Sequence, residues 1–174
     1  PATVTCTFTP ASVTPAANGS VTSSLAVNTT TATVPGNYAL TVTGTSGSLT
    51  HSAALNMTVN DFNATLTPAS GTVVVGNSAT SAVSVNSLNG FTSGVTLTCA
   101  TGNVNVTCNF SSTLVTPVAN GSASSTLNVL TTGAVTTGSY SVTVTGTSGT
   151  QTRTAVYTLV VNNFSMSVNP VSTT

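Results

Sequence analysis

Very few side chains in this sequence could take part in catalysis. Its 174 residues include one histidine, one basic residue and one acidic residue, which are His51, Arg153 and Asp61. Nucleophilic catalysis by Ser or Cys needs a base beside the nucleophile and an acid that orients the base. His51 and Asp61 are ten residues apart, and a single acid cannot form the carboxylate pair that cleaves a glycosidic bond. The sequence therefore predicts no enzyme and no catalytic residue.

Metal binding is disfavoured for the same reason, which is the small number of ligands. Calcium takes several oxygen ligands, and structural zinc takes four Cys or His ligands at close spacing. Asp61 has no second carboxylate, so we interpret it as a capping or turn residue, with a calcium ligand as the alternative. His51 has no other ligand nearby and is interpreted as a polar residue on a solvated strand face. We expect no metal and no cofactor.

The three cysteines carry the remaining chemistry. Cys99 and Cys108 have eight residues between them and fall on neighbouring expected strands, so we predict a disulfide across a hairpin. Two buried free thiols are the alternative. For Cys6 the partner either lies outside this sequence or belongs to another chain. A disulfide indicates an oxidising compartment, so we expect an extracellular or cell-surface protein.

The chain is also rich in potential glycan acceptors. The pattern Asn-x-Ser/Thr is the signature of N-glycosylation, and many matches arise by chance in a chain with so much Asn, Ser and Thr. We treat all of them as candidate glycosylation sites, with O-glycans on the Thr/Ser-rich surface as an alternative. The sequons are at Asn18, Asn28, Asn56, Asn63, Asn105, Asn109, Asn120 and Asn163.

Composition excludes several kinds of partner. Charged residues make up 1% of the chain, against roughly 25% in typical soluble domains. Nucleic acids and anionic lipid surfaces are bound through clusters of Lys and Arg, which this chain lacks. Thr, Ser or Asn interrupts every apolar run before it reaches the ~18 residues of a spanning helix. We therefore expect no nucleic-acid binding and no membrane insertion.

A gapless internal repeat organises the chain. When residues 1–72 are aligned with 103–174, 34 of the 72 positions are identical, and Cys6 falls on Cys108. The heptapeptide TVTGTSG at 41–47 returns at 143–149, and Asn163 takes the place of Asp61. A period of 102 residues is too long for a solenoid turn and matches a small β-sandwich domain. We predict that 1–60 are the C-terminal part of a preceding repeat, that 61–162 are a complete repeat, and that 163–174 are the first strand of a following one.

Thr and Val dominate the complete copy, and both favour strands because they are β-branched. Alternating apolar residues predict half-buried strands. The expected strands are a first strand split into 63–67 and 72–75, then 78–86, 95–99, 104–110, 124–130, 139–145 and 153–161. Tyr140, near the start of the penultimate strand, is compatible with a tyrosine corner or with an ordinary core tyrosine.

Two stretches point to a family. GNYALTVTGTSGSLTHSAALNMTVNDF (36–62) resembles the end of one bacterial immunoglobulin-like tandem repeat followed by the start of the next. SGVTLTCATGNVNVTCNFSSTLVTP (93–117) is similar to the middle of such a repeat. The resemblance implies an all-β fold of immunoglobulin-like sandwich repeats, in a large secreted or surface protein of stalk, adhesin or filament type. It does not choose among these roles, because a fold does not specify a function.

Edge strands usually carry charges that block pairing with other sheets, and this chain has almost none. We therefore expect a non-enzymatic structural protein that forms an extended extracellular fibre, stalk or filament, with neighbouring copies of itself as partners, head to tail. An adhesive or carbohydrate-binding surface module is the alternative. The copies are joined either in one continuous chain or by donation of a terminal strand. The continuous chain is favoured, because adding 163–174 to 1–60 still leaves the counterparts of 73–102 missing.

Overall fold

The computed structural model describes residues 3–168, and within this range the chain is all-β, with no helix. Its residues form two compact units, Pro1–Val59 (unit 1) and Asn60–Thr174 (unit 2), which are described separately below. No strand is assigned to residues 163–168, and the rest of the expected first strand of a following repeat, 169–174, lies outside the described residues.

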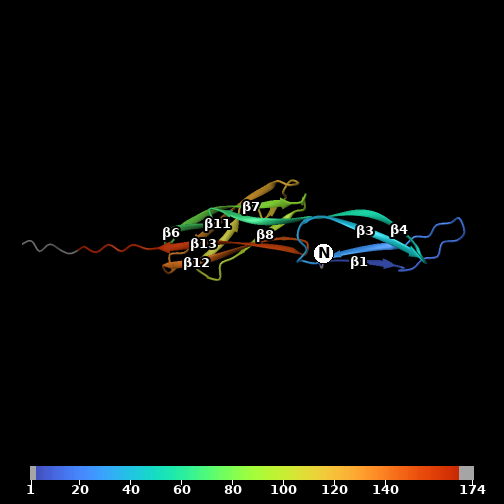
Figure 1. Ribbon diagram of the computed structural model, residues 1–174. Helices are drawn as coiled ribbons and strands as arrows, with labels where there is room; N and C mark the ends of the chain where they lie inside the picture. The colour runs from blue at the N-terminus through green and yellow to red at the C-terminus, as the bar shows by residue number, and fades with distance from the viewer. Residues whose placement is uncertain (1–2, 169–174) are drawn as a thin grey trace, which may run out of the picture. The chain divides into compact units, whose positions relative to one another are not determined.

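Unit 1 consists of two antiparallel strand pairs. The first joins β1 (Val4–Thr9) to β2 (Ser24–Thr29), and the second joins β3 (Gly36–Ser46) to β4 (Leu49–Val59). The long hairpin β3–β4 is visible in Figure 1. Its turn contains Gly47 with a φ of 58°, a left-handed conformation that glycine adopts without steric cost.

Unit 2 has two sheets. One sheet has five strands in the order β10-β8-β12-β13-β6, and the other has four in the order β5-β7-β11-β9. The strands are β5 (Asp61–Thr67), β6 (Ser70–Val74), β7 (Ser78–Leu88), β8 (Val95–Ala100), β9 (Val106–Phe110), β10 (Leu114–Val115), β11 (Ser122–Thr131), β12 (Gly138–Ser148) and β13 (Gln151–Asn162). The long strands β12 and β13 lie next to each other in Figure 1.

The split first strand of unit 2 joins the two sheets. β5 pairs with β7 in the four-stranded sheet, whereas β6 pairs in parallel with β13 in the five-stranded sheet. Pro68 and Ala69 form the short break between them. Proline cannot donate a ladder hydrogen bond, so it favours an interruption of the strand at this point.

One hydrophobic core holds the two sheets of unit 2 together. Because side chains alternate along a strand, each sheet presents every second residue to this core. Phe62 of the four-stranded sheet lies 5.1 Å from Phe91, measured between ring centroids. The buried apolar residues are Phe62, Val73, Val83, Val85, Phe91, Val95, Leu97, Val106, Val115, Leu127, Val129, Val135, Val142, Val144, Tyr157, Leu159 and Val161.

Alternation predicted most of this core. Tyr157, Leu159 and Val161 of the last strand are buried, and Val156 on the other face is exposed. The prediction for Val104 was wrong: it is 90% exposed and precedes β9, which begins at Val106. A turn occupies this position, in which the side chain of Asn103 accepts a hydrogen bond from the backbone of Asn105 (2.8 Å). The short strand β10 was not predicted, because two residues carry no periodicity.

The same strand register occurs in both units. In the β3–β4 hairpin, Gly36 pairs with Val59 and Ser46 pairs with Leu49. In the β12–β13 hairpin, the residues 102 positions further on, from Gly138–Val161 to Ser148–Gln151, pair in the same way. The pairs between β1 and β2 likewise correspond to those between β9 and β11. Unit 1 therefore has counterparts of β9, β11, β12 and β13.

Candidate functional site: the open face of unit 1

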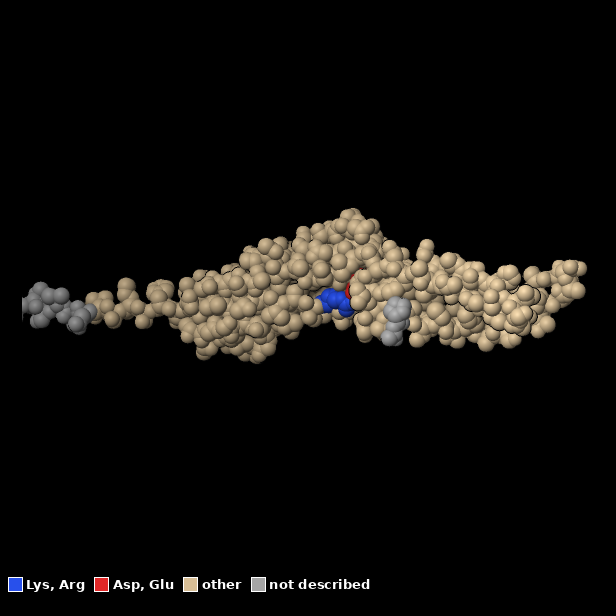
Figure 2. All heavy atoms as spheres, viewed as in Figure 1, with Lys and Arg blue, Asp and Glu red and all other residues tan. Residues whose placement is uncertain are grey.

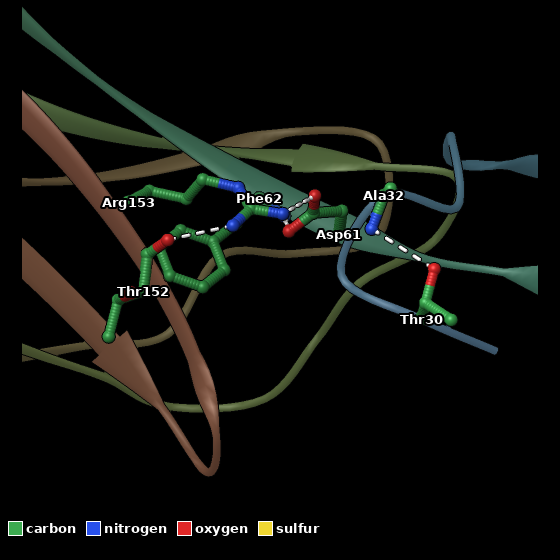
Figure 3. Close-up of polar contacts among 6 residues, drawn as sticks. All are labelled: Thr30, Ala32, Asp61, Phe62, Thr152 and Arg153. Atoms are coloured by element: carbon green, nitrogen blue, oxygen red, sulfur yellow. Dashed lines mark hydrogen bonds and ion pairs between the residues drawn. The ribbon is translucent and has the colours of Figure 1, made fainter. Parts of the chain in front are cut away.

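The single acidic and single basic residue of the chain form an ion pair within unit 2. The Arg153 guanidinium on β13 donates to a carboxylate oxygen of Asp61 on β5, and also to the backbone carbonyl of Thr152 at 2.7 Å (Figure 3). The second carboxylate oxygen of Asp61 accepts from the backbone N–H of Phe62 at 2.7 Å. On the face drawn in Figure 2, the two charges form one spot on an otherwise uncharged surface.

The sequence did not predict this pair, because Asp61 was interpreted as a capping or turn residue, with a calcium ligand as the alternative. Asp61 is only 6% exposed, and a buried carboxylate needs a partner of opposite charge or strong hydrogen bonds. The signal that could have found the pair is that these are the only formal charges in the chain. The ion pair between Asp61 and Arg153 therefore links β5 to β13.

His51 is the other sequence candidate for chemistry. His51 is exposed on β4, in the other unit from Asp61. Within residues 3–168, no three His, Cys, Asp or Glu side chains come together as metal ligands would. Over the same range, the structure has no helix that is long and apolar enough to cross a membrane.

The structure contains a disulfide between Cys99 and Cys108, with the Cα atoms 6.3 Å apart. The expectation that it crosses a hairpin was wrong, because β8 and β9 belong to different sheets. The bond therefore ties the five-stranded sheet to the four-stranded sheet, beside the shared core. Cys6 on β1, the counterpart of Cys108, is an exposed free thiol.

The candidate glycan acceptors are on the surface, with one exception. Asn105 is half-buried, and its side-chain oxygen accepts from the Thr132 hydroxyl at 3.1 Å. The other seven are exposed, although the side-chain oxygens of Asn63, Asn109 and Asn120 accept hydrogen bonds from neighbouring residues. Glycosylation at these asparagines stays a prediction.

The tyrosine at the start of the penultimate strand makes the same contact in both units. The Tyr140 hydroxyl donates to the backbone carbonyl of Thr136 at 2.8 Å, and the Tyr38 hydroxyl donates to that of Val34 at 2.6 Å. A hydroxyl that bonds the backbone a few residues upstream is the defining contact of a tyrosine corner. Of the two interpretations offered by the sequence, the structure favours the corner.

Unit 1 leaves open the face that unit 2 buries. We call the side of β1–β4 that corresponds to the unit 2 core the open face. Leu55 on this face is 43% exposed, whereas its counterpart Tyr157 is 1% exposed. Val13 is 39% exposed, whereas Val115 is 6% exposed. Apolar side chains at core positions therefore remain accessible to a partner.

A hollow lies on the open face. Its volume is about 240 Å³, and its walls are mostly apolar. Phe8 and Pro10 contribute one side, and Val42, Thr43 and Gly44 of β3 contribute another. No titratable side chain lines it. The hollow can accept apolar side chains.

Comparison with known proteins does not identify a family. No protein-family model matches the sequence, and no curated protein matches it significantly. Solved structures that resemble the chain include domains 4 and 5 of the S-layer protein SbsC, at 20% identity and a TM-score of 0.43, covering 91% of this chain and 69% of that one. Domains 4–9 of the same protein match at 19% identity and a TM-score of 0.45, over 96% of this chain and 22% of theirs. A family 123 glycoside hydrolase from Clostridium perfringens matches at 14% identity and a TM-score of 0.45, over 61% of this chain and 28% of its own.

Proposed function

We propose that this protein is a non-enzymatic structural component of an extracellular fibre, stalk or filament, built from tandem immunoglobulin-like domains. The repeat is the observation that carries the proposal: 34 of 72 aligned residues are identical without a gap, and the aligned strands pair in the same register. A chain that repeats one domain with constant spacing forms an array whose length grows with the number of copies. In this proposal 61–162 are one complete repeat, flanked by parts of two others.

The surface chemistry supports a structural role. The only two formal charges neutralise each other within unit 2, so no charged patch is available for an ionic ligand. The outer strands of its sheets are β10 and β6 in one sheet and β5 and β9 in the other. Apart from Asp61, which is paired to Arg153, these strands carry no charge that would block pairing with a neighbouring strand. Neighbouring copies of the same protein are the partners that this surface fits best.

The cross-sheet disulfide supports an extracellular location. Disulfides persist outside the reducing cytosol, and here one joins the two sheets of unit 2 beside their shared core. A domain that bears load or resists proteolysis gains from a covalent link between its layers. We place the protein at the cell surface or in secreted material on this ground.

Solution scattering on concatenated repeats tests the proposal. Chains carrying one, two and three copies of 61–162 in tandem should have maximum dimensions that rise linearly with copy number. Compact particles, whose dimension rises only with the cube root of mass, would refute an extended array. Electron micrographs of native material should show rods or fibres, and isolated globules there would count against the fibre.

A further inference from the structure

A short segment after β13, residues 163–168, carries three large apolar side chains on its surface. Phe164, Met166 and Val168 alternate with polar residues, and all three are exposed. Alternate residues of an extended chain point to the same side, so these side chains would share one face of a strand. Large apolar side chains that gather on one surface mark interaction sites. The 163–168 segment therefore has the pattern of a strand whose apolar face has still to be buried.

The 163–168 segment is equivalent to the start of β5, 102 positions earlier. Apolar residues occupy every second position in both, beginning at Phe62 in β5 and at Phe164 in the segment. The backbone N–H of Phe164 donates to Asn163 Oδ1 at 2.9 Å, just as that of Phe62 donates to Asp61 Oδ1 at 2.7 Å. Phe164 is nevertheless 79% exposed, whereas Phe62 is fully buried. The segment thus has the alternation and the first local contact of β5 without its burial.

The hollow on the open face has the place that Phe62 fills in unit 2. A Cβ on Gly146 would lie 3.2 Å from Phe62 Cε2, so the phenyl ring packs directly against this glycine. A Cβ on the counterpart Gly44 meets no atom within 4 Å, and Gly44 lines the hollow. The walls of the hollow are mostly apolar and include no titratable side chain, which suits an uncharged aromatic ring. A phenylalanine in the setting of β5 is what the space beside Gly44 fits.

A free strand edge lies beside the hollow. Ser23, which directly precedes β2, lines the hollow, and β2 pairs only with β1 among the residues that the structure describes. Its counterpart β11 pairs with β7 as well as with β9. A free edge presents N–H and C=O groups that bind an added strand, and the alternate side chains of that strand enter neighbouring pockets. An extended segment along β2 would therefore direct every second side chain to the open face.

We propose that the 163–168 segment of one molecule binds along β2 on the open face of a second molecule and inserts Phe164 into the hollow beside Gly44. The proposal rests on the array of repeats proposed above and names a contact by which separate chains join head to tail. The segment and the walls of the hollow are both uncharged, so the contact buries no charge. The segment covers the hollow and the adjacent edge of β2, and the rest of the open face stays accessible.

Sedimentation velocity over a range of protein concentrations tests the proposal. Each molecule has one segment and one hollow, so the contact is heterologous, and species larger than dimers should form as the concentration rises. Phe164→Ser removes the inserted ring, and Gly44→Leu fills the hollow without meeting another atom at its Cβ. Each variant should remain monomeric. Val104→Ser is the matched control, because it removes an apolar side chain that is 90% exposed elsewhere in unit 2, and it should associate like the unmodified chain.

A mixture of the two variants gives the sharpest result. The Phe164→Ser variant keeps an intact hollow, and the Gly44→Leu variant keeps an intact segment. One contact can then form between one molecule of each variant, and neither product has a second complementary pair of surfaces. We expect dimers that contain both variants and no larger species.

A peptide with the sequence of residues 163–168 gives a second measurement, which replaces the mixture if Gly44→Leu fails to fold. It is labelled with fluorescein and added to the Phe164→Ser variant, whose substitution lies on an exposed segment. The amide NMR signals of Gly44 and of β2 should shift, and those of β12 should not. The same peptide with Phe164→Ser should bind at least about tenfold more weakly, because it lacks the aromatic side chain that is buried in the hollow.

The proposal is overturned if the unmodified chain stays monomeric at every concentration, including the case in which the segment folds back onto its own molecule. It is also overturned if the Phe164→Ser and Gly44→Leu variants both associate as the unmodified chain does, since a different surface then joins the molecules. A peptide that leaves the Gly44 signal unchanged has the same consequence. The concatenated repeats of the scattering experiment are joined covalently, so the extended array and this contact can fail separately.

Discussion

The matched glycines Gly146 and Gly44 allow a quantitative test of how the two units differ. A Cβ on Gly146 would lie 3.0 Å from Val95 Cγ1 and 3.2 Å from Phe62 Cε2, and both of these side chains are fully buried. Forcing one extra carbon into such a core costs about 1–3 kcal/mol. Replacing glycine by alanine within a strand returns about 0.5–1 kcal/mol. We therefore expect Gly146→Ala to lower the free energy of unfolding of unit 2 by about 1 kcal/mol, within a range of about 0–2.5 kcal/mol.

Gly44→Ala is the matched control. No atom lies within 4 Å of its Cβ, so only the favourable backbone term remains, and unit 1 should gain about 0.5–1 kcal/mol. Urea unfolding followed at the amide NMR signals of β12 and β3 measures the two units separately. For Gly146→Ala the midpoint of unit 2 should fall by roughly 0.5–1 M. Equal changes at the two positions would refute the reasoning, because the two glycines would then have equivalent surroundings.

Three further changes test the other contacts of unit 2. Asp61→Asn should lower the free energy of unfolding by about 1–3 kcal/mol, because it leaves the partly buried Arg153 without its charged partner. Urea unfolding of Asp61→Asn, Arg153→Met and the double variant forms a double-mutant cycle, which should give a coupling energy clearly different from zero. Replacing both Cys99 and Cys108 by alanine should lower the free energy of unfolding of unit 2 by about 2–3 kcal/mol, which is the loop-closure value for a sequence separation of 9. Urea unfolding of this variant and of the unmodified chain, both without reductant, measures the difference. Burial raises the pKa of Tyr157 above its ordinary value of 10.0. The Tyr157 hydroxyl therefore loses its proton at a lower pH in the unfolded chain than in the folded protein. Stability should be retained below about pH 10 and should fall as the pH rises through the pKa of the folded state. Thermal melts of Tyr157→Phe should not show that fall.

The strand pattern could be predicted because it depends on local chemistry. Alternation of Val and Leu with Thr and Ser indicates which side of a strand faces the core, and Val142 and Val144 are buried as this rule requires. The break at Pro68 was predictable because proline lacks an N–H. The pattern failed at Val104, where a turn, which alternation does not detect, replaces the start of the strand.

The sequence by itself indicated an all-β chain with a 102-residue self-similarity, and it shows three cysteines and a single pair of charges. It could not show that β8 and β9 belong to different sheets, because sheet membership depends on pairings between residues far apart in the chain. For the same reason, only the tertiary structure brought Asp61 and Arg153 together across 92 residues and left Gly44 facing an empty hollow where Gly146 is packed. Local periodicity specifies which face of a strand is apolar, whereas the identity of what covers that face is decided only when distant strands meet.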